Sequence, residues 1–264
     1  MDTARILTII DKEWAEIFKN RMVLATIGFM PLIFTIMPLV MLYFTGTSGD
    51  ISGDMADMPP QFTQACGDLN ASDCIQYFVL NQFMLIFMMM PLMIPTAIAA
   101  YSIVGEKTTR SLEPLLATPI TTEELLTAKA LAAAIPAIIA SWSSFFIFVL
   151  LMPLVKASPA LIAQVLSPTW LIAVLIIGPL MAVAAVNMAV LVSSRVNDPR
   201  VAEQISVVLI VPIMAVMFAQ IGGLLVVNRD LMMISAAVML VVDAALIYAG
   251  ARIFQRETIL TRWK

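Results

Sequence analysis

Histidine is absent from this sequence of 264 residues, and cysteine occurs only twice, at Cys66 and Cys74. The absence of histidine removes the commonest metal ligand and the usual proton shuttle, so we expect neither a metal site nor a nucleophile–histidine pair. No glycine is followed by lysine, which excludes the P-loop whose backbone amides hold nucleotide phosphates. No basic patch or fold pattern supports nucleic-acid binding.

Charged residues are also scarce: they make up 12% of the chain, whereas 61% of it is hydrophobic. An ordinary soluble domain is about 45–50% apolar and about 25% charged. Because so few charges could not cover so much apolar surface in water, lipid must surround much of the chain. The expected membrane spans contain one ionisable side chain, Asp243. That leaves neither a pair of aspartates nor a lysine for an intramembrane protease.

Six apolar windows are long enough to span a membrane, which takes about 20 residues in a helix. They predict an all-α integral membrane protein with a single transmembrane domain over residues 1–264. Prolines at 31, 38, 91, 95, 136, 179 and 212 are expected to kink or interrupt several spans. The windows cover about 22–44, 79–104, 130–155, 169–192, 205–227 and 231–251.

The basic residues fall almost entirely on one side of this topology. With six spans both termini share a side, and of the 15 Lys and Arg residues only Lys156 and Arg229 lie on the other side. Basic residues flanking spans are retained in the cytoplasm. We therefore predict a multi-pass protein of the cell membrane with both termini cytoplasmic.

Residues 3–20 precede the first span and have the pattern of an amphipathic helix. Leu7, Ile10, Trp14 and Ile17 recur at spacings of three and four, with charged residues largely opposite. Such a helix is expected to lie in the membrane interface. It is either a simple anchor or a contact for a cytoplasmic partner.

The outer loop, residues 45–78, contains both cysteines, eight positions apart on the side that faces an oxidising compartment. A disulfide between Cys66 and Cys74 is plausible there, with free thiols as the alternative. The bond would stabilise the loop by about 2–3 kcal/mol on the loop-entropy estimate.

The longest cytoplasmic loop, residues 105–129, reads GEKTTRSLEPLLATPITTEELLTAK. Thr121 and Glu124 have the spacing of a capping box, which predicts a helix start. Pro119 should end a preceding short helix around residues 111–117, whose leucines share one face. A short helix with an apolar stripe and charged flanks is either a docking element or a helix packed on its own spans.

This loop resembles the segment after the second span of type-2 ABC transporter permeases, which has Glu-Lys followed by Leu-Glu-Pro-Leu-Leu-Ala-Thr-Pro. Two further stretches, 193–204 and 251–260, resemble the second inner loop and the C-terminal tail of that family. The likeness covers essentially the whole chain. It is closest to the subgroup that includes sodium-efflux and drug-efflux permeases.

The resemblance implies the permease subunit of an ATP-driven exporter. In that family two permease chains pair, as a homodimer or a heterodimer, and each docks on a separate cytoplasmic ABC ATPase, which binds the ATP and Mg²⁺. The loop would then be the coupling segment that passes ATPase closure to the spans, and this chain would be a transport subunit rather than an enzyme. By motif position the coupling role falls on Glu106, Arg110, Glu113, Pro114, Leu115 and Thr118.

Three polar residues inside the spans form a candidate intramembrane polar site: Asp243, Asn187 and Gln220. Asp243 is either a cation or proton site or a structural hydrogen-bonding residue, and the two amides are expected to join helices. Two alternatives to the exporter stay open. One is an ATP-independent secondary transporter that uses Asp243 as its ion site, and the other is a membrane scaffold that moves nothing.

Overall fold

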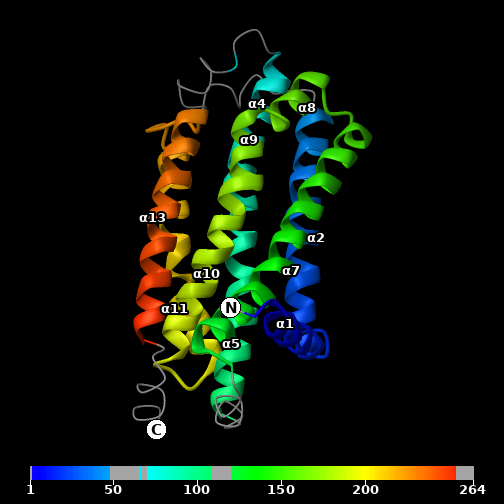
Figure 1. The fold of residues 1–264 in the computed structure, drawn as a ribbon. Helices are drawn as coiled ribbons and strands as arrows, with labels where there is room; N and C mark the ends of the chain where they lie inside the picture. Colours follow the sequence, from blue (N-terminus) through cyan, green and yellow to red (C-terminus); the bar gives the residue numbers. More distant parts are fainter. Residues whose placement is uncertain (1, 48–65, 67–69, 109–119, 254–264) are drawn as a thin grey trace.

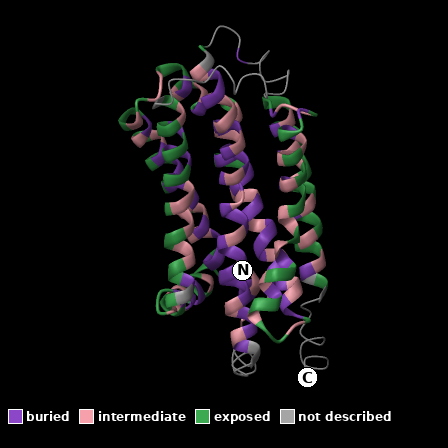
Figure 2. Ribbon diagram, turned by 180° about the vertical axis from the view of Figure 1, so that it is seen from behind, coloured by how far each residue is buried: buried purple, intermediate pink, exposed green. Residues whose placement is uncertain are grey.

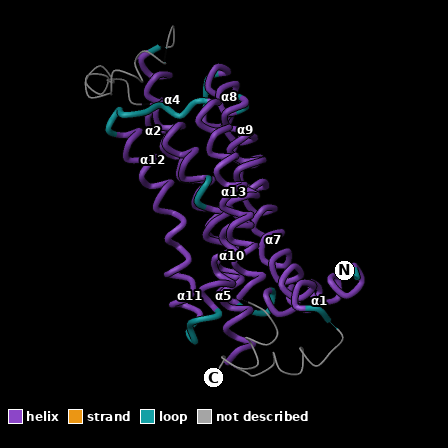
Figure 3. The backbone as a smooth tube through the Cα atoms, turned by 60° about the vertical axis from the view of Figure 1, so that its left-hand side comes forward, coloured by secondary structure: helices purple, strands orange, loops and turns teal. Residues whose placement is uncertain are grey.

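Six apolar helical stretches run side by side in the structure (Figure 1). The computed structural model describes residues 2–47, 66, 70–108 and 120–253. Within these ranges every regular element is helical, as the tube in Figure 3 shows, and six stretches are long and apolar enough to cross a membrane. The predicted all-α membrane fold is therefore confirmed. Helix α1 lies at the end of the bundle where the sixth stretch has its C-terminal end, and we call this the α1 end.

The stretches consist of single helices or of several helices in succession. The N-terminal helix α1 spans Thr3–Ile17. The first three stretches are α2 (Arg21–Thr47), α4 (Ala71–Phe87) with α5 (Met90–Thr108), and α7 (Thr122–Leu151) with η1 (Met152–Val155). The fourth stretch consists of α8 (Pro159–Val165), α9 (Pro168–Ile172), η2 (Ala173–Ile177) and α10 (Gly178–Ser193). The fifth consists of α11 (Pro199–Ser206), η3 (Val207–Ile210) and α12 (Val211–Ile221), and the sixth is α13 (Arg229–Ile253).

Three of the prolines interrupt the stretches, as predicted. The turn between α4 and α5 comes just before Pro91, the π-helical segment η2 before Pro179, and the 3₁₀ segment η3 before Pro212. Proline has no N–H to donate and its ring crowds the carbonyl four residues earlier, so the preceding turn changes its pitch. Pro31, Pro38, Pro95 and Pro136 instead lie within continuous helices.

The π-helical turn frees a carbonyl that a neighbouring helix uses. The Gly178 N–H donates to the carbonyl of Ala173 rather than to that of Val174. The indole N–H of Trp142 on α7 donates to the Val174 oxygen instead, at 3.1 Å. The break in the fourth stretch therefore also joins it to the third, which satisfies a backbone group that lipid could not.

The fifth stretch ends at Ile221, short of the predicted end at residue 227. Gly223 has a φ of 68°, a left-handed conformation that suits glycine. The Leu224 N–H donates to the carbonyl of Ala219 at 2.8 Å and the Gly223 N–H to that of Gln220 at 3.0 Å. This is a Schellman motif, which ends the helix although the following residues are still apolar.

The core of the bundle follows the second and fourth stretches. In the second, 83% of the apolar window is buried, against 17% in the fifth and sixth, and Figure 2 shows buried residues concentrated along the middle of the bundle. Four buried aromatic rings, of Phe87, Phe145, Phe148 and Trp170, meet with centroids 5.5 to 6.4 Å apart. They join α4, α7 and α9 near the end opposite α1.

A disulfide joins Cys66 to Cys74, with Cα atoms 5.4 Å apart. Cys74 lies in the first turn of α4, at the end opposite α1. The bond ties the last part of the outer loop to the start of the most buried stretch.

The aromatic cluster yields a stability prediction. Phe145→Ala should lower the free energy of unfolding by about 3–5 kcal/mol, because the truncated ring leaves a cavity between three helices. Phe146 is the matched control: it adjoins Phe145 in the chain but is 58% exposed, so Phe146→Ala should change stability by about 0.5 kcal/mol or less. Denaturation of the purified chain in detergent measures both. Equal losses would contradict the packing described.

Candidate functional site

Helix α1 packs against α7 rather than standing apart from the bundle. It begins at the N-cap Asp2, whose side chain accepts from the Ala4 N–H. Ile9 and Ile10 are buried, and they cluster with apolar residues near the start of α7. Leu7, predicted for the apolar face, is 60% exposed. Of the other residues predicted for this face, Ile10 and Ile17 are buried and Trp14 packs against the core, so most of the predicted face contacts the bundle.

Lys129, in the second turn of α7, lies at the centre of the contact between α1 and the bundle. The residue is only 5% exposed. Its Nζ lies 2.7 Å from Glu13 Oε1 on α1 and 2.8 Å from Glu106 Oε2 on α5. It also donates to the Ser102 hydroxyl at 2.8 Å. One ammonium group thus joins three helices.

Two further contacts complete the group. The Ser102 hydroxyl donates to Glu13 Oε2 at 2.6 Å, and Lys12 Nζ donates to Glu106 Oε1 at 2.7 Å. Lys12 lies at the rim, with its side chain 40% exposed. We call Lys12, Glu13, Ser102, Glu106 and Lys129 the stem cluster, because Glu106 and Lys129 lie near the two ends of the 105–129 loop.

Two hydrogen bonds fix α1 on either side of the stem cluster. The Trp14 indole N–H donates to the Ala132 carbonyl at 3.1 Å, and the Asp2 backbone N–H donates to Glu124 Oε1 at 2.8 Å. Glu124 also accepts from the Thr121 N–H, while its own N–H donates to Thr121 Oγ1. The predicted capping box is therefore confirmed, and it serves a second purpose by holding the start of α1.

Charge balance makes this burial tolerable. A buried ion must be paired, because the loss of hydration costs several kcal/mol, and here two lysines face two glutamates. Burial opposes ionisation of Glu13, but the charge of Lys129 and the hydrogen bonds from Lys129 and Ser102 outweigh it, so the pKa of Glu13 lies below its ordinary value. Burial likewise opposes the charge of Lys12, but the hydrogen bond and charge of Glu106 outweigh it and raise the pKa of Lys12.

The residues predicted for ATPase coupling divide into two groups. Glu106 lies in the stem cluster, 6% exposed, where it contacts this chain's own lysines. The others fall outside the described residues: Arg110, Glu113, Pro114, Leu115 and Thr118.

The three intramembrane polar residues lie on three different helices. Asn187 on α10 donates to the carbonyl of Val183 in its own helix at 2.8 Å, so this bond does not join helices. Gln220 is fully buried near the end of α12, and its amide has no hydrogen-bond partner among the described residues. Helix α12 packs against α4, whereas α10 packs against α13.

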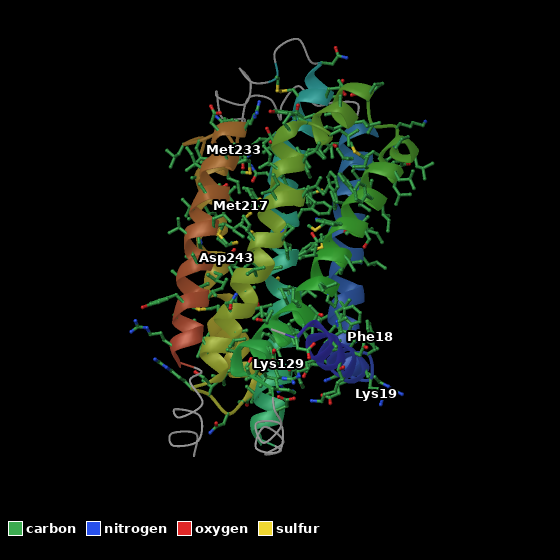
Figure 4. The ribbon with its side chains drawn as sticks, viewed as in Figure 1. Phe18, Lys19, Lys129, Met217, Met233 and Asp243 are labelled. Carbon is green, nitrogen blue, oxygen red and sulfur yellow. A yellow bond between two sulfur atoms is a disulfide. The ribbon has the colours of Figure 1, made fainter. Side chains whose placement is uncertain are left out.

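Asp243 lies on α13, farther from the α1 end than Lys129 (Figure 4). It is 5% exposed, and neither carboxylate oxygen has a hydrogen-bond partner within the described part of the chain. A buried carboxylate without a partner is costly in lipid. Nothing described around it supplies the structural hydrogen bond that one of the two interpretations expected.

The comparison with known families decides the class. A family model described as ABC-2 family transporter protein matches residues 7–240. The chain belongs to this family. It is therefore a membrane permease of an ABC transporter, and the match extends from within α1 into α13. No curated protein matches the sequence significantly.

In this ABC-2 transporter protein, the sequence pattern alone did not single out Glu13 or Ser102. Lys129 was identified only as the last residue of the loop. A signal for Glu13 was present: it lies three residues after Ile10 and four before Ile17, so it falls on the apolar stripe of the helix. A charged residue on such a stripe needs a buried partner.

Acidification of the ABC-2 transporter protein should loosen α1. The ordinary pKa of Glu13 is 4.5 and its folded value is lower, so the docking energy from its charge is present above pH 4.5 and lost as the pH falls through the folded pKa. A spin label on the exposed position Ala15 should gain mobility over that range. In Glu13→Gln the label should be mobile already, without this pH dependence.

The matched control for this titration is Glu16→Gln. Glu16 is on the same helix, and its side chain is 59% exposed where it contacts Lys12. An exposed pair contributes little, so this variant should keep the wild-type profile. A Glu13→Gln profile identical to wild type would contradict the role given to the Glu13 carboxylate.

Proposed function

We propose that this chain is the permease subunit of an ATP-driven exporter, which forms the translocation pathway and couples to a separate cytoplasmic ABC ATPase. ATP and Mg²⁺ bind to that partner, because the sequence has no glycine–lysine pair with which to build a P-loop. The α1 end faces the cytoplasm in this proposal. The sodium-efflux or drug-efflux subgroup stays a prediction from the sequence.

The observation that carries the proposal is the stem cluster beneath the loop. The 105–129 segment resembles the coupling segment of the family, and Glu106 and Lys129 form an ion pair of 2.8 Å between its two sides. A loop with a rigid base can pass a displacement into the helices that continue from it. Those helices are α5, in the most buried stretch, and α7.

A second permease chain completes the pathway in this proposal. The fifth and sixth stretches expose large apolar residues, such as Phe218 at 60% and Val241 at 71%. These faces suit lipid or another apolar helix bundle. Pairing of two copies, or of two related chains, would cover part of this surface.

One observation favours a second candidate function. Asp243 is buried, ionisable and without a partner among the described residues, and such residues mark ion pathways in many transporters. An ATP-independent secondary transporter with Asp243 as its ion site would use it. The family match and the loop favour the ATP-driven permease.

Purification tests the proposed function directly. The tagged chain, isolated in mild detergent from its host, should retain a P-loop ATPase in stoichiometric amount, identified by mass spectrometry. Glu113→Ala and Leu115→Asp should abolish this retention without preventing membrane insertion. The loss follows because a charge or a missing contact in the coupling segment weakens docking.

Leu154→Asp is the matched control, since Leu154 is 76% exposed at the end opposite α1, and it should retain the ATPase. A chain that purifies alone and transports in vesicles without ATP would overturn the proposal. In that case Asp243→Asn should abolish the dependence on an ion gradient, which would establish the secondary transporter instead.

A further inference from the structure

Lys129 joins parts of the chain that the sequence keeps far apart. Its ammonium group contacts Glu13, which is 116 residues away, and Ser102, 27 residues away. It also pairs with Glu106, so α1, α5 and α7 meet at one buried nitrogen. We propose that Lys129 is a positioning residue for energy coupling, which makes these three helices move as one body when the loop is displaced. This inference rests on the proposed function.

The ion pairs of Lys129 resist small displacements of the helices that they join. A buried ammonium with two carboxylates is tolerable only while both stay within contact, because each unpaired buried ion costs several kcal/mol. Lys129 is 5% exposed and Glu13 is 2% exposed, so water does not replace a lost partner without opening the site. Small shifts of the loop stem are therefore resisted, and the stem transmits a displacement instead of absorbing it.

The first span, α2, is also connected to the stem cluster, through α1. Helix α1 connects to α2 by a tight turn in which the Asn20 N–H donates to the carbonyl of Ile17 at 3.1 Å and the Leu24 N–H to that of Asn20 at 2.9 Å. Helix α2 also packs against α7. The stem cluster thus holds α1 with the ends of the first three spans, although only α5 and α7 continue into the loop.

The test needs a variant that removes the ion pair between α1 and α7 without leaving a buried charge unpaired. Glu13→Gln with Lys129→Met removes one negative and one positive charge and leaves the 2.7 Å pair of Lys12 and Glu106 intact. Lys129→Arg keeps the charge and should retain most of the function. Glu13→Asp is a milder variant, which keeps both charges but withdraws the carboxylate from Lys129 by one methylene.

Pulsed electron resonance on nitroxide labels measures whether α1 and α7 move together. Labels at Thr8 on α1 and Leu131 on α7 are at exposed positions, and the disulfide keeps Cys66 and Cys74 from being labelled. In the wild-type chain in lipid, the distance distribution should be narrow and unchanged by nucleotide. In the double variant it should broaden, and Glu13→Asp should broaden it less.

A second label pair measures transmission to the far end of the bundle. Leu154 and Leu224 are exposed there, after α7 and after α12 respectively. In the complex with its ATPase, ATP with vanadate should shift this distance in the wild type and in Lys129→Arg. In the double variant this distance should no longer shift, although the ATPase still hydrolyses ATP. A chain that was only destabilised would not lose the shift alone.

Glu16→Gln on the exposed face of α1 is the matched control and should behave as wild type in both measurements. The inference would be overturned if ATP with vanadate shifted the Leu154–Leu224 distance fully in the double variant and in Glu13→Asp. This holds whatever the width of the Thr8–Leu131 distance distribution. Failure of the proposed function would give a different result from failure of this inference. In that case the wild type binds no ATPase and the Leu154–Leu224 distance does not shift, while the Thr8–Leu131 label pair still reports the attachment of α1.

Discussion

The burial of one ammonium group constrains the α1 end of this protein. Lys129 sits where water is excluded, so carboxylates from α1 and α5 must approach it together. That requirement fixes the rotation of α1, the register of α5 against α7, and the separation of the two sides of the loop. Apolar contacts around Ile10 and Ala128 add stability but would tolerate other rotations. The ion pairs select one arrangement and therefore give the loop a defined base.

The sequence predicted most of the architecture because lipid imposes strong rules on it. Span number, helical class, proline interruptions and the Thr121–Glu124 capping box all follow from local patterns. The end of the fifth span was less predictable, since Gly223 stops the helix while the residues after it remain apolar. The periodicity of α1 placed Ile10 and Ile17 on its buried face, but it could not name the partners of Glu13, which lie 89 and 116 residues away.

The polar residues inside the bundle behave differently from those at the α1 end. Asn187 satisfies its amide within its own helix, whereas Asp243 and Gln220 find no partner in the described residues. In the stem cluster each charged side chain has an opposite charge within 2.8 Å, as expected of a group that maintains structure. Unpaired buried groups are more often where a protein meets protons, ions or another chain. The stem cluster therefore has a structural role, whereas Asp243 on α13 and Gln220 on α12 lie outside it.

The long separation between Glu13 and its partners has a consequence for biosynthesis. Glu13 leaves the ribosome before its partners: Ser102 and Glu106 emerge with the end of the second span, and Lys129 emerges with the start of the third. Until then α1 has no complete docking site, and its apolar face must rest on the membrane surface or on a chaperone. Docking of α1 can therefore be complete only once the start of the third span has emerged. A chain interrupted before Lys129 would lack the ammonium group with which Glu13 pairs, so α1 would remain undocked.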